Sequence, residues 1–424
     1  MIEQILKAFN QNNITKYRIN EVEAEQLELF FIRRKLDMRR GKKVHKYNVT
    51  VYRDFEKDGK KNLGSSEVEL SESMTQDELN QKIKDAYFSA SFVSNPYYEL
   101  PSGTKEEFIT LESGLSSLTL EEIAKKMTEA LFAEDTQKDV FLNSAELFIN
   151  RETCHIINSE GIDVGYKVNR VNGEFVAQCK EPQDVETYQD FAYDDLDTDA
   201  LRTKVAETLN LTKARAQAIK APAAGTYSVL LSGNSVKELI SYYISRSGAG
   251  MIYPKYSNYQ TGMMIQGEQI TGEKLNLTLK AREPYSVEGI SMKDRVLLED
   301  SVLKTIHGTC RFSYYLNIEP TGNYRRYQMP AGSKSMEELK QGKYLHVINF
   351  SDFQMDSFTG HFGGEIRLAF LSDGTTITPV TGGSISGNIL EAQKELVFSK
   401  ELQKEKGFEG PYAVLLKDIK VAGC

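Results

Sequence analysis

Cysteine is scarce in this sequence, basic residues are outnumbered by acidic ones, and long apolar runs are missing. The four cysteines, Cys154, Cys179, Cys310 and Cys424, are not closely paired, which argues against a disulfide-stapled secreted fold and favours a reducing cytoplasm. No run reaches the roughly 18 to 20 apolar residues of a membrane-spanning helix, so no membrane partner is expected. Residues 1–9 lack the basic start of a signal peptide and predict an amphipathic helix.

The formal net charge of -8 argues against duplex DNA as the main partner, because phosphate binding requires a basic surface. Basic residues cluster only in 33–43, where two strands joined by a solvated turn account for them, and nucleic acid is not expected as a partner. Hydrophobic residues make up 40% of 424 residues, which is enough for two domains with separate cores.

The first two hundred residues repeat one pattern, which predicts an internally duplicated α+β domain. In each copy an apolar segment, at 29–34 and at 147–152, precedes alternating strand residues. Each copy then closes with an amphipathic helix, the first carrying Leu79 and the second carrying Leu201.

Short-range signals mark the ends of several elements. Capping boxes predict helix starts at three Thr or Ser residues that are followed three positions later by Glu. These pairs are Thr75 and Glu78, Thr119 and Glu122, and Ser235 and Glu238. Asn172-Gly173 predicts a type I′ hairpin turn, and the acidic run 181–199 predicts a solvated loop ahead of a helix rather than a calcium loop.

The segment 220–225 reads as a linker, which divides the chain into an N-terminal domain (1–222) and a C-terminal domain (223–424). The second domain begins with a buried strand at 227–231 and a helix that ends near Gly248. Its buried stripe comprises Val236, Leu239, Ile240, Tyr243 and Ile244. Beyond residue 250 glycines separate short alternating runs, so we expect a mostly antiparallel sheet or open barrel with few helices.

The sequence carries no standard catalytic signature. It has no Walker loop, no G-x-G-x-x-G, no G-x-S-x-G and no H-E-x-x-H. His307 and Cys310 are three apart and His361 and Glu365 four apart, but a zinc site needs three or four ligands. Cys154 and His155 are adjacent on a strand and point to opposite faces. The five histidines are His45, His155, His307, His346 and His361.

Tyrosines gather after the first C-terminal helix and suggest a binding surface, because tyrosine offers rigid amphipathic contact area. The alternative is that they belong to the core and to a sheet edge. The candidate peptide groove comprises Tyr242, Tyr253, Tyr256, Tyr259 and Glu288.

Four C-terminal stretches together resemble the TldD/PmbA family, named historically as modulators of DNA gyrase. They are residues 227–250, 288–303 with 320–323, 371–390, and 413–423. The resemblance covers about 200 residues, whereas the N-terminal half is similar only in architecture. It implies a cytoplasmic, zinc-dependent proteolytic system that acts on unfolded or small polypeptides.

The departures from the family pattern concern the zinc motif. Active members carry H-E-x-x-x-H on the helix that aligns with residues 238–246, where this chain has Ser241, Tyr242 and Arg246. No cysteine occurs in 399–409 to match the third ligand. The resemblance therefore implies a PmbA (TldE)-like pseudoenzyme with no catalytic residue, no metal site and no cofactor of its own. Zinc is expected in a partner that bears H-E-x-x-x-H, or else the chain pairs with itself as a dimer.

Two other functions stay open. The chain is a divergent metallopeptidase if His307, Cys310 or His361 binds zinc. It is a homodimeric peptide-binding or scaffold protein if no protease partner exists. Direct action on gyrase has least support, because the acidic chain offers no DNA surface.

Overall fold

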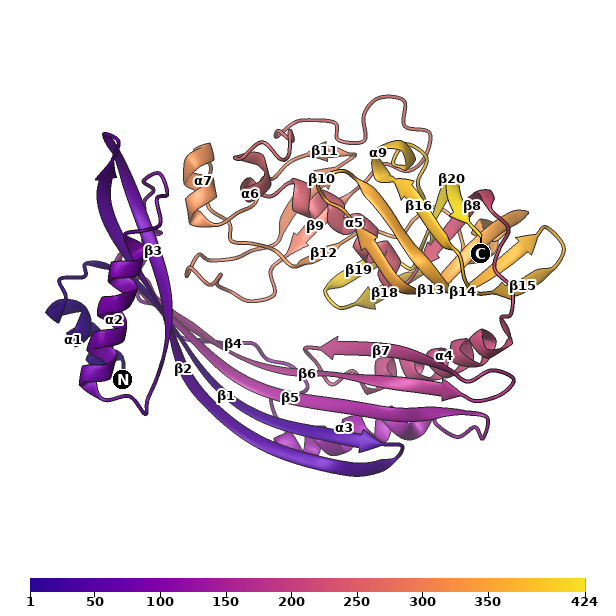
Figure 1. Ribbon diagram of the computed structural model, residues 1–424, viewed down its shortest axis with the longest axis horizontal. Coiled ribbons are helices and arrows are strands. Elements are labelled where there is room, and N and C mark those ends of the chain that lie inside the picture. The colour runs from indigo at the N-terminus through magenta and orange to yellow at the C-terminus, as the bar shows by residue number, and fades with distance from the viewer. Residues whose placement is uncertain (424) are drawn as a thin grey trace.

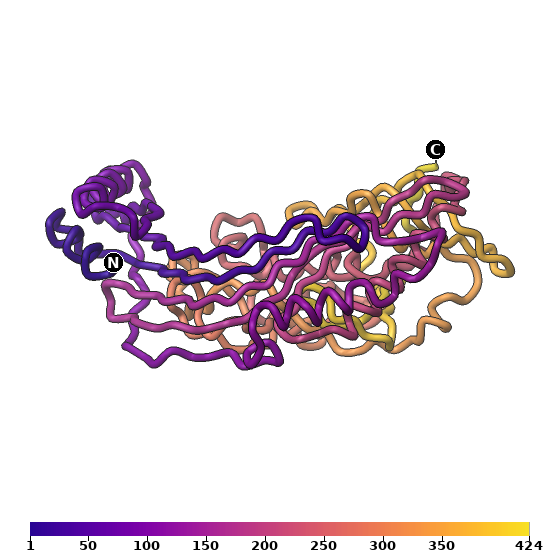
Figure 2. The backbone as a smooth tube through the Cα atoms, turned by 90° about the horizontal axis from the view of Figure 1, so that it is seen from below, coloured from indigo at the N-terminus to yellow at the C-terminus, as the bar shows by residue number. Residues whose placement is uncertain are grey.

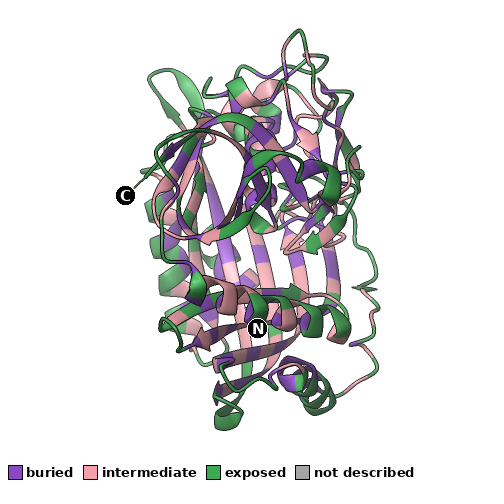
Figure 3. Ribbon diagram, turned by 90° about the vertical axis from the view of Figure 1, so that its right-hand side faces the viewer, coloured by how far each residue is buried: buried purple, intermediate pink, exposed green. Residues whose placement is uncertain are grey.

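The computed structural model describes residues 1–423 and has a mixed α+β architecture, as the sequence predicted. A long curved sheet from the N-terminal half runs beneath the C-terminal half (Figure 1). The first two helices of the chain lie at one end of the molecule and the last strand lies toward the other (Figure 2). Buried residues follow the strands of both halves, and exposed residues gather on the outer helices and loops (Figure 3).

The N-terminal half contains one seven-stranded sheet in the order β3-β2-β1-β5-β6-β4, with β7 paired to β6. Its strands are β1 (Lys16–Ile32), β2 (Lys35–Lys57), β3 (Lys60–Ser71), β4 (Ile109–Thr110), β5 (Val140–Asn158), β6 (Asp163–Cys179) and β7 (Val185–Tyr193). Its helices are α1 (Ile2–Gln11), α2 (Gln76–Ala90), α3 (Leu120–Ala133) and α4 (Thr198–Gln217). The order helix, three strands, helix occurs twice, and the copies meet where β1 pairs antiparallel with β5.

The helices cover one face of this sheet in two separate groups. Ile19 of β1 packs in one core with residues of α1 and α2. Leu27 of the same strand packs in a second core with residues of α3 and α4. Because alternate residues of a strand share a face, Ile19 and Leu27 lie on the same side. A polar stretch therefore separates the two helix groups on this face.

Two of the three predicted capping boxes form. Thr75 and Glu78 cap α2, and Thr119 and Glu122 cap α3, each with both reciprocal hydrogen bonds. The first helix, α1, is amphipathic as expected and buries Ile5 and Phe9.

Two N-terminal predictions are wrong. Asn172 and Gly173 form no turn, because they lie inside β6 and pair with Phe148 and Leu147 of β5. The acidic run 181–199 is not a simple loop, because β7 passes through it and pairs with β6. In both places long-range pairing overrides a local signal.

The C-terminal half begins after residues 218–224, which join α4 to β8. One sheet contains β8 (Gly225–Ser232), β13 (Lys343–Met355), β14 (His361–Asp373), β15 (Ile377–Val380), β16 (Ser384–Asn388), β17 (Val397–Phe398) and β20 (Ala413–Ala422). Its order is β13-β8-β20-β16-β14-β15, and an additional β13–β14 pairing closes the path. The expected barrel is therefore closed rather than open.

A second, six-stranded sheet has the order β11-β10-β9-β12-β19-β18. Its strands are β9 (Leu277–Lys280), β10 (Arg295–Glu299), β11 (Val302–Leu303), β12 (Arg326–Gln328), β18 (Leu402–Glu405) and β19 (Phe408–Pro411). The helices of this half are α5 (Asn234–Arg246), α6 (Ala249–Ile252), α7 (Cys310–Leu316), α8 (Met336–Leu339) and α9 (Ile389–Ala392). One core joins α5 to both sheets.

Contacts between the two halves include both ion pairs and apolar clusters, one of which packs Tyr98 against Tyr315. Arg170 donates to Glu283 at 2.6 Å, and Asp194 forms ion pairs with Arg282 and Arg326. A small apolar cluster around Tyr285 adds Ile156, Ile162 and Val164. Within residues 1–423, no helix has the length and apolar character required to cross a bilayer.

Candidate functional site

Helix α5 stands where the resemblance places the zinc motif. It follows β8 through Gly233, whose φ of 64° lies in the left-handed region that glycine adopts without strain. Gly233 is the N-cap, so the helix begins at Asn234 and Ser235 is already inside it. The predicted Ser235–Glu238 capping box is therefore wrong, because the turn after β8 moves the helix start two residues earlier.

The predicted apolar stripe of α5 is confirmed. Its five members are between 0% and 6% exposed and contact both C-terminal sheets: Val236, Leu239, Ile240, Tyr243 and Ile244. Tyr242 joins them at 1% exposure, and its ring lies 5.4 Å edge-on from that of Tyr243. The Tyr243 hydroxyl donates to Gln393 at 3.1 Å. Burial raises the pKa of Tyr242, so the phenol is a neutral core group.

Ser241 and Arg246 both donate hydrogen bonds to backbone carbonyls of the same chain. The Ser241 hydroxyl donates to the Glu238 carbonyl, one turn back, at 2.6 Å. The Arg246 guanidinium donates to the carbonyl of Tyr256 and, at 3.5 Å, to that of Phe358. It also lies 5.5 Å from the ring centroid of Tyr259 and 5.9 Å from that of Tyr242.

These residues do not fit a zinc ion. A hydroxyl bonded to its own helix, a buried phenol and a cationic guanidinium offer neither imidazole nor carboxylate at the motif positions. Arg246 also places a positive charge where a cation would bind. No hydrolytic step can be derived through a metal at α5.

The alternative ligands are not gathered either. His307 is buried beneath α5, and its Nε2–H donates to the Ile244 carbonyl at 2.9 Å. Cys310 is the first residue of α7, and its thiol donates to the Glu99 carbonyl at 3.1 Å. Burial, reinforced by Glu288 and Glu99, raises the pKa of this thiol to about 12, which disfavours the thiolate. His361 is exposed on β14, and the part of the chain that the structure describes brings no third ligand to these residues.

The five candidate groove residues have different surroundings. Tyr242 and Tyr259 are buried, at 1% and 4% exposure, and present no surface to a peptide. Tyr253, at 40% exposure, contacts Phe312 and Tyr315 of α7. Tyr256, at 57%, contacts Phe358. The Glu288 carboxylate accepts the backbone N–H of Cys310 at 2.9 Å.

A cavity of about 490 Å³ lies between the two halves, next to α7. The N-terminal half contributes Glu106, Ile162 and Val164, and the C-terminal half contributes Ile290 and Tyr314. The Tyr285 hydroxyl donates to Glu106 at 2.6 Å across its wall. Both polar and apolar side chains line the cavity.

A histidine and carboxylate cluster on the N-terminal sheet was not predicted. Glu21 lies between His45 and His155, with Asp163 on the far side of His155. The hydrogen bond from His155 lowers the pKa of Glu21 to about 2, against the opposing effect of burial. Burial acts to lower the pKa of His155, but hydrogen bonds to Glu21 and Asp163 outweigh it and raise that pKa. Glu21 and His155 are 134 positions apart in the sequence, so only the strand register brings them together.

Comparison with known proteins identifies the family. Residues 112–217 match the profile of the PmbA/TldA metallopeptidase central domain, and residues 224–423 match that of the C-terminal domain. A metalloprotease of Methanothermobacter thermautotrophicus is 28% identical over 129 residues, which span 26% of this chain and 28% of that protein. An uncharacterized protein of Methanocaldococcus jannaschii is 21% identical over 317 residues, covering 67% of this chain and 72% of the other.

Solved structures share the whole fold. TldE from Thermococcus kodakarensis superimposes with a TM-score of 0.79 at 17% identity, covering 100% of both chains. A candidate modulator of DNA gyrase from Thermotoga maritima gives 0.76 at 18% identity, covering 99% of both chains. The profile matches and the shared fold agree with the resemblance seen in the sequence, and the chain belongs to the PmbA/TldD family of metallopeptidase-like proteins.

Proposed function

We propose that this protein is the non-catalytic subunit of a cytoplasmic TldD/PmbA-type metalloprotease that degrades unfolded or small polypeptides. The observation that carries the proposal is Arg246. Its guanidinium binds backbone carbonyls and stacks near two tyrosines at the position where an active member has a zinc-binding histidine. A partner subunit with an intact H-E-x-x-x-H then supplies the zinc and the hydrolytic chemistry.

The intact packing around α5 supports a role for this chain in assembly of the protease. The stripe of α5 is buried and the barrel around it is closed, so the scaffold is complete although the ligands are absent. The relative from Thermococcus bears the name TldE and shares this fold over its whole length. This chain accordingly contributes a folded surface rather than a reaction centre.

The cavity between the halves is the proposed contact site for the polypeptide. Ile290 and Ile162 offer apolar contact, and Glu106 offers a hydrogen-bond acceptor for peptide N–H groups. The exposed ring of Tyr314 lies at the same cavity and adds a surface on which a side chain can pack.

Reconstitution tests this function. Cleavage of fluorescently labelled unfolded casein is measured with this chain alone, with an H-E-x-x-x-H-bearing homologue from the same genome alone, and with both. We expect no cleavage by this chain, and cleavage by the mixture that exceeds that of the homologue and is abolished by replacing the homologue's motif glutamate with Gln.

The variant Ile290→Arg inserts a charge into the cavity and is expected to lower the activity of the mixture. Ile377→Arg is the matched control, because Ile377 is 57% exposed on β15 and does not line the cavity. Chelator-sensitive cleavage by this chain alone would establish the divergent peptidase instead. Self-association with no binding to the homologue would favour the scaffold protein.

A further inference from the structure

The strand register places Glu21, Glu23 and His45 side by side on one face of the N-terminal sheet. Glu23 pairs with His45 across β1 and β2, and Glu21 pairs with Tyr47, two residues along. Opposite residues of an antiparallel pair share a face, as do alternate residues of one strand. The group occupies the polar stretch between Ile19 and Leu27, which pack against the two different helix groups.

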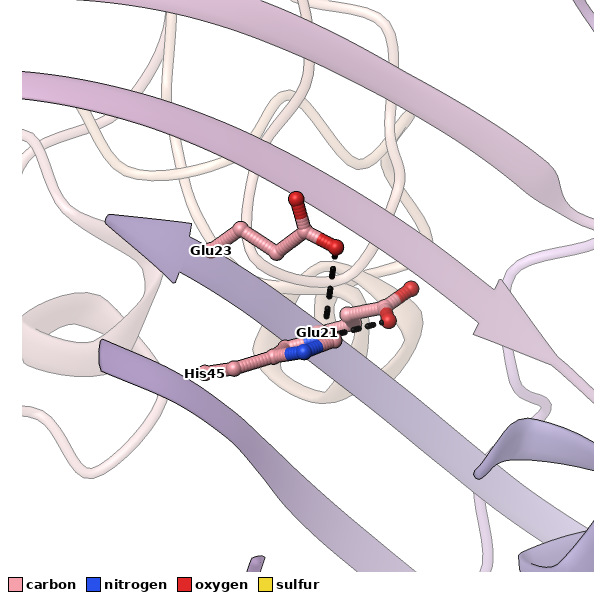
Figure 4. A group of neighbouring side chains, drawn as sticks. All are labelled: Glu21, Glu23 and His45. Atoms are coloured by element: carbon pink, nitrogen blue, oxygen red, sulfur yellow. Dashed lines mark hydrogen bonds and ion pairs between the residues drawn. The ribbon is translucent and has the colours of Figure 1, made fainter. Parts of the chain in front are cut away.

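Their donor atoms converge on one point. The His45 Nε2 atom lies 2.8 Å from Glu21 Oε1 and 3.5 Å from Glu23 Oε1, and the three donors all lie within 4.8 Å of one another. Figure 4 shows both carboxylates reaching from β1 toward the imidazole on β2. Ligands around a tetrahedral zinc ion, with bonds of about 2.0–2.2 Å, are separated by about 3.3 Å, so small adjustments admit an ion.

A fourth carboxylate fixes the orientation of the imidazole. Glu72, in the loop between β3 and α2, lies 2.8 Å from His45 Nδ1. With Nδ1–H donated to this carboxylate, the lone pair of Nε2 is available to an ion in place of the contacts that Nε2 makes with Glu21 and, at 2.9 Å, with the Tyr47 hydroxyl. A carboxylate on the non-ligating nitrogen is the usual support of a metal-binding histidine.

The group lacks fixed positive charge. In residues 1–423, Glu21, Glu23 and Glu72 form no ion pair with lysine or arginine, and only the imidazoles of His45 and His155 face them. Glu21 is largely buried, with 16% of its side chain exposed, so its charge is only partly compensated by water. A divalent cation at the shared point would supply the missing charge.

We propose that Glu21, Glu23 and His45 bind one divalent transition-metal ion, with zinc(II) as the fitting probe. One imidazole nitrogen and two carboxylate oxygens suit zinc and similar metals, whereas calcium and magnesium prefer oxygen alone. Glu23 is 59% exposed on its side chain, which leaves a side open for water as a further ligand. This site lies on β1 and β2, away from the position of the zinc motif on α5. It was not predicted from the sequence, which implied no metal site in this chain.

The proposed ion has a structural role. It bridges β1 to β2, and through His45 and Glu72 it also holds the segment that leads into α2. This inference does not depend on the proposed protease function, because none of its residues contributes to α5 or to the cavity between the halves.

Calorimetry with zinc chloride on the full-length, chelator-treated protein tests the site. We expect one ion per chain, a roughly 100-fold loss of affinity in His45→Ala, and at least about a 10-fold loss in Glu23→Gln and Glu72→Gln. Glu69→Gln is the matched control, because Glu69 is an exposed carboxylate on β3 that pairs with Lys46. His361→Ala, at an exposed position of β14, is the histidine control.

Two further readouts distinguish loss of the metal site from misfolding of a variant. Zinc is expected to raise the thermal midpoint of the wild type and of Glu69→Gln by more than it raises that of Glu23→Gln. Glu23→Gln is the mildest of the changes, because the Glu23 side chain is exposed. Cobalt(II) is expected to give visible absorption bands that Glu23→Gln removes. The proposal is overturned if zinc produces no stoichiometric binding, or if binding survives both His45→Ala and Glu23→Gln. Loss of binding in His361→Ala would also overturn it and place the ion elsewhere.

Discussion

Replacing Arg246 with methionine tests whether this arginine stabilises α5 or is kept for a ligand. Methionine retains an unbranched side chain of similar reach but removes the charge and the planar donors. In the structure, Arg246 bonds the carbonyls of Tyr256 and Phe358 and stacks near Tyr242 and Tyr259. If it is structural, the substitution must lower the stability of the C-terminal half.

The structure sets the size of the effect. A charge-assisted hydrogen bond contributes about 1.5–3 kcal/mol, and each of the two ring contacts, near the outer limit of the interaction, adds about 0.5 kcal/mol or less. The Arg246 Nε atom is buried without a partner, and removing it regains about 1 kcal/mol or more. The net loss is therefore about 1–2 kcal/mol, which corresponds to a fall in thermal midpoint of about 2–8 °C for a domain of this size.

Thermal unfolding followed by circular dichroism measures this shift. Ser245→Ala is the control, since Ser245 is the exposed neighbour on the same helix and is expected to leave the midpoint within about 1 °C. An Arg246→Met protein as stable as the wild type would refute the structural assignment. It would indicate that the guanidinium is retained to bind a substrate or partner group.

Two other substitutions probe the fold. Gly173→Ala is expected to destabilise the protein by about 1–3 kcal/mol in chemical denaturation, because a Cβ there would lie 2.2 Å from the Glu146 carbonyl oxygen and 2.7 Å from the Phe191 ring. Gly41→Ala is expected to leave stability nearly unchanged, because Gly41 in β2 has open space around it. If Gly173→Ala and Gly41→Ala changed the stability equally, the placement of Gly173 inside β6 would be contradicted. Asp194→Asn is expected to lower the midpoint by the equivalent of about 1–2 kcal/mol at pH 7, because it removes the ion pairs with Arg282 and Arg326, of which only Arg282 keeps a second partner, Glu283. Burial opposes ionisation of Asp194, but the two arginines lower its pKa, so its contribution is complete above about pH 5 and is lost as the pH falls through the lowered folded-state value. The difference in thermal midpoint between Asp194→Asn and wild type is therefore expected to narrow below about pH 4. A difference in midpoint that stays constant with pH would show that ionisation of Asp194 does not contribute to stability.

Local signals in the sequence predicted what depends on neighbouring residues. The capping boxes at Thr75 and Thr119 form because a hydroxyl and a glutamate three residues apart need only each other. The apolar stripe of α5 was predicted for the same reason, since a period of 3.6 residues is a property of one helix. At Ser235 the same reasoning failed, because the left-handed turn at Gly233 decides where the helix begins.

Features that depend on strand pairing could not be predicted. Asn172-Gly173 has the composition of a turn, but Phe191 of β7 packs over the glycine and continuous pairing with β5 keeps β6 extended. The cluster around Glu21 joins β1 to residues 24 and 134 positions away. No spacing rule connects these residues until the register of β1 against β2 and β5 is known.

The structure also changes how the loss of the zinc motif is understood. The sequence predicted that the motif positions of α5, Ser241, Tyr242 and Arg246, would lie where a metal binds and would not belong to the buried apolar stripe. In the structure Tyr242 belongs to the core, at 1% exposure, so a motif position has been incorporated into the packing. Restoring a glutamate there would remove a buried ring and bury a carboxylate that has no metal to pair with, which costs several kcal/mol. Absence of the zinc motif and adaptation of the core are therefore coupled in this chain, and reinstalling the motif on α5 alone is expected to unfold the helix rather than to create a zinc site.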